Sequence, residues 1–289
     1  MHIAHLILTH KNPAQLERLI KAMDHPAFDF YIHLDRKTPI APFAHLTQRP
    51  NVYMIRKRAA IYWAGWGTIQ ATLNGFREIL AKSASPDGGY DYINVMSGQD
   101  FPLKSAAHIF QYLRERRGKE FILCDSIEDK WKEAAIRVTR YHFINWRIPG
   151  KFRLANLFNK IMPPRKYPLD HKLVGRANWF TLTPAAATYV LDFLKNNPKV
   201  VRFFKYVWGA DEFIFSTILY NSPFREQIVD NLVYVDWTGQ TGGHPRVLGA
   251  GDFERLRRTD KLFGRKFDMS ADAAIFGMLE EWIAGPEGD

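Results

Sequence analysis

Cysteine and long apolar runs are almost absent from this sequence of 289 residues. The single cysteine, Cys124, cannot form an internal disulfide, and we expect a half-buried strand residue there without a redox or zinc-binding role. No stretch is long and apolar enough to predict a membrane helix. The N-terminus enters a strand-like run at once, without the regions of a signal peptide, so a cytoplasmic location is expected.

Acidic residues are fewer than basic ones, 30 against 40, which gives a formal net charge of +10. Such a charge attracts anions, and the candidates are nucleic acid, an anionic membrane surface and a phosphorylated small substrate. The sequence has no zinc-finger spacing, no aromatic RNA-binding motif and no basic helix followed by heptads. Nucleic acid is therefore not an expected partner, whereas a phosphorylated substrate and peripheral contact with an anionic membrane surface stay open.

The first hundred residues alternate short apolar runs with helical periodicity, which is typical of βαβ units. Asn12-Pro13 supplies an N-cap and a first-turn proline for one helix, and a second helix is expected around residues 69–80. These features predict an α/β fold with a Rossmann-like, mostly parallel central sheet flanked by helices. The strands are expected at residues 3–8, 28–34, 52–55 and 92–96.

The rest of the chain is less regular. Residues 130–172 mix aromatic residues and arginines without sustained periodicity, so loops and short helices are expected there. A short strand is expected at residues 179–182, and Thr183-Pro184 should cap the helix that follows. Another helix is expected to start near residues 210–212, and a glycine-rich turn at 239–243.

Polar residues follow several of the expected strands: Thr9-His10, Asp35, and the tetrad at residues 97–100. Ligands of open α/β sheets bind outside the carboxyl ends of the strands, so these positions are candidates for a binding site. Asp35 could accept from a ribose hydroxyl or a base N–H, or it could cap the next turn. His10 could contact a phosphate, although a lone histidine is more often structural.

Glu212 is expected in the first turn of an apolar-faced helix, where the helix N-terminus favours the ionised carboxylate that a general base needs. The alternative is that Glu212 only complements the helix dipole while Asp211 caps the helix. Arg265-Lys266 and Arg246 are cations that suit a departing diphosphate, or else ordinary exposed cations. Trp179 could stack on a sugar or base, or pack in the core.

Taken together, these segments resemble the core-2/I-branching β-1,6-N-acetylglucosaminyltransferase and peptide O-xylosyltransferase family, glycosyltransferase family 14. The resemblance runs nearly end to end. It is carried by residues 3–11 (IAHLILTHK), 31–37 (YIHLDRK), 61–68, 92–104 (YINVMSGQDFPLK), 178–183 (NWFTLT), 211–224, 234–237 and 262–268 (LFGRKFD). The animal enzymes have a membrane anchor and several disulfides, which this sequence lacks, so a bacterial-type member is expected.

The resemblance implies a GT-A-like fold in a single domain, residues 1–289, with a nucleotide-binding half at 1–125 and an acceptor and catalytic half at 126–289. It implies an inverting glycosyltransferase that moves a sugar, GlcNAc or xylose, from a UDP-sugar to a hydroxyl of a glycan or lipid-linked saccharide. No cofactor and no metal are expected, in agreement with the absence of any Asp-x-Asp pair from the sequence. A non-catalytic UDP-sugar or glycan-binding protein with the same fold is the alternative.

The resemblance also implies residue roles. Residues 210–212 match a Pro-Asp-Glu motif whose glutamate is the catalytic base, here Glu212, although Gly209-Ala210 replaces the usual Ser-Pro and a looser helix start is expected. The expected UDP contacts are Ile7, Thr9, His10, Asp35, Tyr62, Arg246, Arg265 and Lys266. The expected substrate contacts are Asp100, Trp179 and Asp211.

Overall fold

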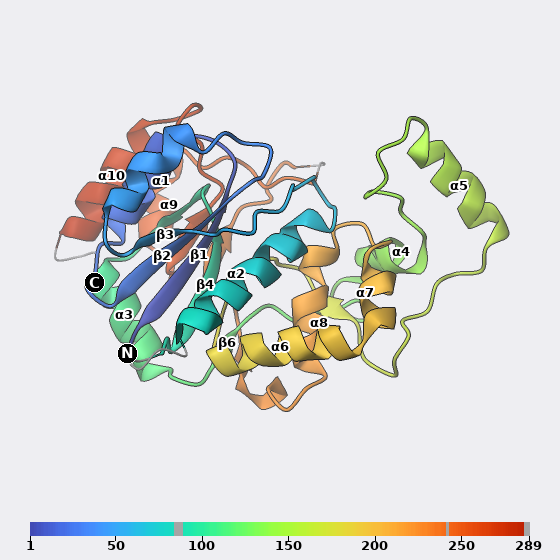
Figure 1. Ribbon diagram of the computed structural model, residues 1–289. Helices are drawn as coiled ribbons and strands as arrows, with labels where there is room; N and C mark the ends of the chain where they lie inside the picture. Colours follow the sequence, from blue (N-terminus) through green and yellow to red (C-terminus); the bar gives the residue numbers. More distant parts are fainter. Residues whose placement is uncertain (84–88, 241–242, 286–289) are drawn as a thin grey trace.

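A seven-stranded sheet forms the centre of the protein in the computed structural model, which describes residues 1–83, 89–240 and 243–285 (Figure 1). Its strand order is β10-β6-β9-β4-β1-β2-β3. The strands are β1 (Ile3–Thr9), β2 (Phe28–Leu34), β3 (Val52–Met54), β4 (Tyr92–Ser97), β6 (Glu120–Phe121), β9 (Phe180–Leu182) and β10 (Ile228–Val229). Strand β1 is parallel to β2 and β4, whereas β9 is antiparallel to β4 and β6. The predicted α/β class with a mostly parallel central sheet is confirmed.

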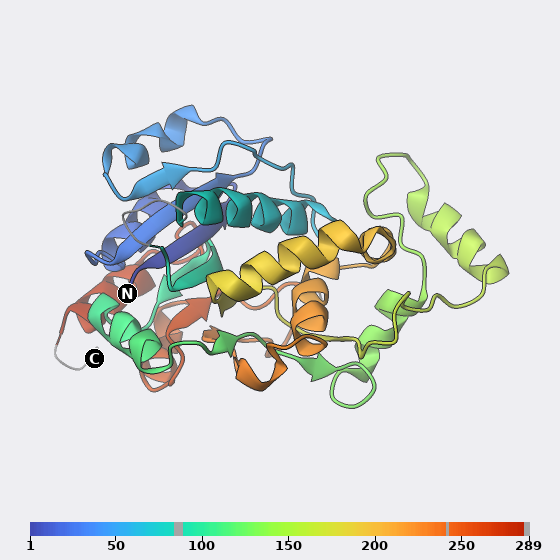
Figure 2. The ribbon, with the colours of Figure 1, turned by 60° about the horizontal axis from the view of Figure 1, so that its bottom comes forward.

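Helices cover both faces of this sheet, whereas α5 projects away from it. The described helices are α1 (Pro13–Ala22), α2 (Gly67–Ser83), α3 (Ala106–Glu115), α4 (Ala135–Thr139), α5 (Lys151–Ile161), α6 (Pro184–Asn196), α7 (Pro198–Phe204), α8 (Ile214–Tyr220), α9 (Phe253–Arg257) and α10 (Ala274–Ala284). The 3₁₀ turns are η1 (Ala41–Gln48), η2 (Lys132–Ala134), η3 (Ala210–Glu212), η4 (Arg225–Gln227) and η5 (Ala250–Asp252). Helices α2 and α6 lie side by side (Figures 1 and 2).

The strand order reverses beside β1. The chain passes from β1 through α1 to β2 on one side, and from β3 through α2 to β4 on the other. Right-handed crossovers in opposite directions place α1 and α2 on opposite faces and open a crevice at the carboxyl ends of β1 and β4. The sequence explains this local order: every residue of β1 is buried, and the Asn12 side chain caps α1 by accepting from the Gln15 amide.

Two small sheets bring distant segments to that crevice. A three-stranded sheet has the order β11-β12-β5, from β11 (Val233–Val235), β12 (Phe263–Arg265) and β5 (Asp100–Pro102), and β7 (Asp125–Ser126) pairs with β8 (Val174–Gly175). Strand β12 is antiparallel to β5, which sets Arg265 opposite Asp100. The central sheet and the three-stranded sheet both contain strands from each of the two predicted halves of the chain.

Some local predictions need correction. The helix expected near residues 210–212 is instead the separate 3₁₀ turn η3, and α8 begins only at Ile214. Cys124 is half-buried as expected, but it lies between β6 and β7 rather than in a strand. The glycine-rich turn expected at residues 239–243 lies partly outside the described residues. Among the helices that the structure describes, none has the length and apolar character needed to cross a bilayer.

Candidate active site

A cavity of about 910 Å³ opens at the carboxyl ends of β1 and β4, which is within the usual range for small-molecule sites. Thr9 ends β1 and His10 follows it, and Ser97 ends β4 with Gln99 just beyond it. The later part of the chain closes the cavity from the other side with Trp179, Asp211, Glu212, Arg265 and Lys266. The sheet reversal therefore supplies the floor, and the segments after residue 175 supply most of the walls.

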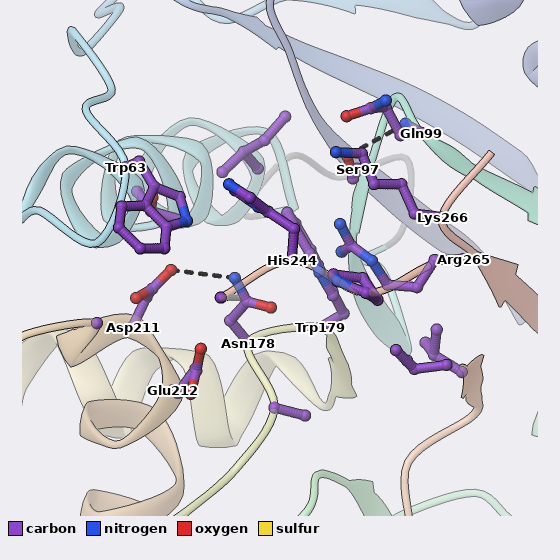
Figure 3. A pocket seen from close by; sticks show the side chains of 18 of the residues that line it. Trp63, Ser97, Gln99, Asn178, Trp179, Asp211, Glu212, His244, Arg265 and Lys266 are labelled. Atoms are coloured by element: carbon purple, nitrogen blue, oxygen red, sulfur yellow. Dashed lines mark hydrogen bonds between the residues drawn. The ribbon is translucent and has the colours of Figure 1, made fainter. Parts of the chain in front are cut away.

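The acidic side of the cavity is built on η3. Gly209 has a φ of 64°, and this left-handed conformation turns the chain into η3. Asp211 Oδ2 accepts from Asn178 Nδ2 at 3.0 Å (Figure 3). Burial raises the pKa of Asp211, and the Asn178 hydrogen bond opposes that shift. The turn thereby presents two neighbouring carboxyl groups, Asp211 and Glu212, to one cavity.

Glu212 is held by Arg137. The guanidinium Nη1 donates to Glu212 Oε2 at 2.8 Å, and the same group donates to the carbonyl oxygens of Trp208 and Gly209 at 3.0 and 3.1 Å. Burial raises the pKa of Glu212, Arg137 opposes the shift, and Asp211 adds to it. A raised pKa makes the carboxylate a stronger proton acceptor, which suits a general base.

This arrangement corrects the expected electrostatics of Glu212. The residue precedes α8 by two positions and does not belong to its first turn. Its carboxylate charge is therefore stabilised by Arg137 rather than by a helix N-terminus. The looser start expected from Gly209-Ala210 is not observed either, because Arg137 binds the Gly209 carbonyl and Ala210 is buried.

The cationic side of the cavity is carried by the end of β12. Arg265 Nη1 lies 3.5 Å from Asp100 Oδ1, and the guanidinium lies 4.6 Å from the centre of the Trp179 ring. Burial lowers the pKa of both Arg265 and Lys266. Within the described residues the Lys266 ammonium has no hydrogen-bond or ion-pair partner, so it is available to a ligand in the cavity.

Figure 3 shows the two groups across the cavity from each other. Asp211 and Glu212 lie on one side, and Arg265 and Lys266 lie on the other. The Trp179 and His244 side chains lie between them. One cavity therefore holds a proton acceptor and, opposite to it, the positive charge that an anionic leaving group requires.

Asp35 has the capping role considered for it, and its contact with a ribose or base stays a prediction. Its Oδ1 accepts from the Lys37 amide at 2.9 Å and its Oδ2 from the Ile61 amide at 3.3 Å, so the side chain fixes the turn after β2. The residue also lines the cavity. His10 lines it too, and its pKa is lowered first by burial and then by the nearby charge of Lys11.

Two predicted contact residues cannot touch a ligand in this structure. Ile7 is fully buried in the core between β2 and β4, because β1 is covered on both faces. Asp100 is also fully buried, lies behind Arg265 and accepts from the Ser97 amide at 2.8 Å. Asp100 can therefore act on a ligand only through Arg265.

Two others lie outside the cavity wall. Tyr62 is exposed, and its ring is covered by Lys37, whose Nζ lies 4.0 Å from the ring centre. Arg246 is engaged elsewhere, with its guanidinium bound to the carboxylates of Asp236, at 2.7 Å, and Asp252. The structure thus does not place Tyr62 or Arg246 in the cavity wall, and their contact with UDP stays a prediction.

Sequence reasoning missed several residues of the site. Asn178 and Lys11 stand inside segments that carried the resemblance, so their motifs could have suggested them. Trp208 and Arg137 had no such signal, since they lie 4 and 75 positions from Glu212 in stretches without a motif. Across the described residues there is no cluster of three or more His, Cys, Asp or Glu side chains that could hold a metal ion. Metal-independent catalysis stays a prediction.

Comparison with known proteins adds independent findings. Xylosyltransferase oxt of Drosophila pseudoobscura pseudoobscura is 24% identical over 94% of this chain and 32% of its own length, and xylosyltransferase 2 of Rattus norvegicus is 25% identical over 99% and 34%. The chain thus spans about a third of the length of these two relatives. The Homo sapiens beta-1,3-galactosyl-O-glycosyl-glycoprotein beta-1,6-N-acetylglucosaminyltransferase 3 is 26% identical over 97% of this chain and 68% of its own length.

Among solved structures, mouse xyloside xylosyltransferase 1 in its apo form covers 91% of this chain and 96% of that chain, with a TM-score of 0.42 and 12% identity. That likeness is too low to carry an argument. The Core-2/I-Branching enzyme family, in contrast, matches residues 3–257, a range that includes the strand ends at the cavity floor and both carboxylates of η3. The chain therefore belongs to the Core-2/I-Branching enzyme family.

Proposed function

We propose that this protein is an inverting glycosyltransferase that transfers a sugar from a UDP-sugar to a hydroxyl of a glycan or lipid-linked saccharide. One observation carries the proposal: the Glu212 carboxylate and the Arg265-Lys266 pair line the same cavity from opposite sides (Figure 3). Membership of a family whose named relatives transfer xylose and N-acetylglucosamine supports it. These two sugars are the first donors to test.

The reaction proceeds by a single displacement. Glu212 accepts the proton of the acceptor hydroxyl as the oxygen forms a bond to the anomeric carbon of the donor sugar. The bond from that carbon to the diphosphate oxygen breaks on the opposite face, and its electron pair leaves with UDP. The attack from one face inverts the configuration, and the proton ends on Glu212.

Positive charge is needed where the diphosphate departs. Lys266 is a cavity cation without an ion-pair partner among the described residues, and Arg265 stands beside it with Asp100 behind it. Both residues lie beyond the part of the chain that the family matches, so their role rests on geometry and charge. They supply the electrostatic stabilisation that a divalent ion provides in other transferases.

The nucleoside occupies the floor of the cavity in this proposal. Thr9, His10 and Asp35 lie there at the carboxyl ends of β1 and β2. The positively charged side chains of Lys11 and Lys37 line the same region. A ribose or base hydrogen-bonds to such strand-end groups, while the diphosphate extends toward Lys266.

The proposal is tested with Glu212→Gln, which removes the proton acceptor and keeps the shape of the side chain. We expect UDP release from the best of UDP-GlcNAc, UDP-xylose, UDP-glucose and UDP-galactose to fall at least about 100-fold. UDP affinity by calorimetry should be unchanged. The exposed Glu128→Gln variant is the matched control. Near wild-type turnover by the Glu212 variant would overturn the assignment of the base, and the absence of turnover in the wild type with any donor would favour a non-catalytic binding protein.

A further inference from the structure

Most of the formal net charge of the chain comes from one segment. Residues 140–169 contain seven basic residues and no acidic one, so they contribute +7 of the formal net charge of +10. The basic residues are Arg140, Arg147, Lys151, Arg153, Lys160, Arg165 and Lys166. None of them forms an ion pair with a carboxylate of the part of the chain that the structure describes. The charge of this segment is therefore not neutralised within the fold.

Helix α5 in this segment projects from the body of the protein, away from the central sheet (Figures 1 and 2). Of its residues, Ala155 alone is buried. Leu154, Leu157 and Ile161 follow one another at i, i+3 and i+7, so they share one face, and they are 42%, 57% and 76% exposed. Globular proteins seldom leave such an apolar stripe in water without a function for it.

Cations and further apolar side chains surround that stripe. Arg153 and Lys160 lie on the helix beside it, roughly 40° and 60° around the helix axis from Leu157 by helical spacing. The exposed apolar side chains around the helix are Trp146, Ile148, Phe152 and Met162. We refer to the exposed side chains of residues 146–162 as the α5 face.

A groove of about 570 Å³ continues this surface toward α7. Aromatic and apolar side chains line most of it, together with the exposed cations Lys166, Lys199 and Arg202. Among the described residues that line the groove, none is acidic. Arg165 has a different task, since its guanidinium donates to the carbonyl oxygens of Arg140, Phe203 and Tyr206 and braces the segment against α7.

The charge decides which partner fits this surface. A second copy of the chain would bring two sets of unneutralised cations together in a symmetric interface, which costs electrostatic free energy. An anionic bilayer satisfies both features at once, because its headgroups attract the cations and its acyl boundary receives the apolar stripe. We propose that the α5 face docks the protein on the surface of an anionic lipid bilayer, with α5 lying in the plane of the interface.

The segment is joined to the active cavity. Asn145 Oδ1 accepts from the Trp66 amide at 2.8 Å, and Asn145 Nδ2 donates to the Lys205 carbonyl at 2.7 Å. Trp63, three positions before Trp66, lines the cavity. Docking by the α5 face would hold the cavity close to a membrane. This position would bring the cavity close to a lipid-linked saccharide acceptor. That consequence rests on the proposed function, whereas docking itself does not.

Flotation of the full chain with lipid vesicles tests the proposal. The vesicles are equal parts phosphatidylglycerol and phosphatidylcholine, or phosphatidylcholine alone. We expect the wild type to float with the anionic vesicles at low salt and to be released as salt increases. Arg153→Glu/Lys160→Glu should lower the partition coefficient at least about tenfold, since each basic residue near the surface adds roughly a fivefold attraction. Leu157→Ser/Ile161→Ser, which removes the apolar stripe without changing the charge, should lower it similarly.

The matched control is Arg114→Glu/Lys119→Glu, which changes the charge equally on exposed residues at and after α3. This control should float like the wild type. Thermal melting verifies that every variant is folded, and all substituted side chains are exposed in the structure. Equal loss in the control, equal binding to neutral vesicles, or no binding of the wild type to anionic vesicles would overturn the proposal. So would concentration-dependent dimerisation that the α5 substitutions abolish, because a second copy would then cover the face.

Discussion

Arg137 Nη1 donates a hydrogen bond to Glu212 Oε2 at 2.8 Å, although the two residues are 75 positions apart in the chain. The guanidinium is covered by the rings of Trp131, Trp208 and Phe213, at 4.6 to 5.0 Å from its carbon. It also binds two backbone carbonyl oxygens of the turn before Glu212. Arg137 therefore fixes both the position and the charge of the proposed base.

Replacement of Arg137 by Met should change the pH dependence of the reaction. Arg137 favours the ionised form of Glu212, so its removal raises the Glu212 pKa further, and the acid limb of kcat/KM moves to higher pH. We expect the rate at pH 6 to fall by about tenfold or more, with partial recovery at pH 8. Arg140→Met, three positions along the chain and exposed, is the control. A uniform loss at every pH would mean that Arg137 has a purely structural role.

Substitution of Lys266 should lower UDP affinity, whereas substitution of Arg246 should lower stability. Lys266→Met removes a cavity cation that has no partner in the described part of the chain, and we expect UDP affinity to fall about 10- to 100-fold with little change in the melting temperature. Arg246→Met leaves two carboxylates, Asp236 and Asp252, without that partner and should lower the free energy of unfolding by about 1–2 kcal/mol. UDP affinity of the Arg246 variant should be retained. Calorimetry and thermal melting of both variants compare the two expectations directly.

Chelation should leave the reaction unaffected. The diphosphate is stabilised by fixed side-chain cations in this proposal, so UDP release in the presence of excess EDTA should equal the rate without it. Loss of activity with EDTA and its return on addition of Mg²⁺ or Mn²⁺ would contradict the prediction. The same assay with the four UDP-sugars also identifies the preferred donor.

Glu120 provides a test of the fold that leaves the cavity untouched. It is fully buried and accepts from the Thr183 hydroxyl and amide at 2.6 and 2.9 Å, yet burial raises its pKa from 4.5 to about 7. The unfolded chain loses this proton near pH 4.5 and the folded chain near pH 7. The Glu120 contribution to the free energy of unfolding therefore falls between these pH values, by about 3 kcal/mol in total.

The Glu120→Gln variant lacks that titration. Its free energy of unfolding relative to the wild type should increase steadily as pH rises from about 4.5 to about 7 and stay constant above that range. Urea unfolding at several pH values measures this difference. A difference that does not vary with pH would show that Glu120 is already ionised throughout the range.

Much of the fold was readable from local sequence because the relevant signals are short-range. The continuous apolar run of β1 and the Asn12-Pro13 cap of α1 need no knowledge of the rest of the chain. The same holds for Asp211, Glu212 and Lys266, which local motifs identified and the fold brings to one cavity. Their predicted catalytic and binding roles stay predictions.

Other features depend on pairings between distant segments. Nothing near Asp100 indicates that it will lie beneath Arg265, because that contact exists only once β12 pairs with β5. Arg246 resembled a phosphate ligand by its position after a glycine-rich stretch, but Asp236 and Asp252 bind it. Arg137 was missed for the same reason, since its partner Glu212 is remote in sequence.

The pairing of β12 with β5 also governs when the site can form. Arg265 ends β12 and Lys266 follows it, so both cations opposite Glu212 are in place only after synthesis has passed residue 266 and β12 has paired with β5. A nascent chain that stops at residue 260 could form the seven-stranded sheet and η3, but it would have no Arg265-Lys266 pair. In the proposed reaction, such a fragment would hold the base Glu212 without the positive charge that the departing diphosphate needs.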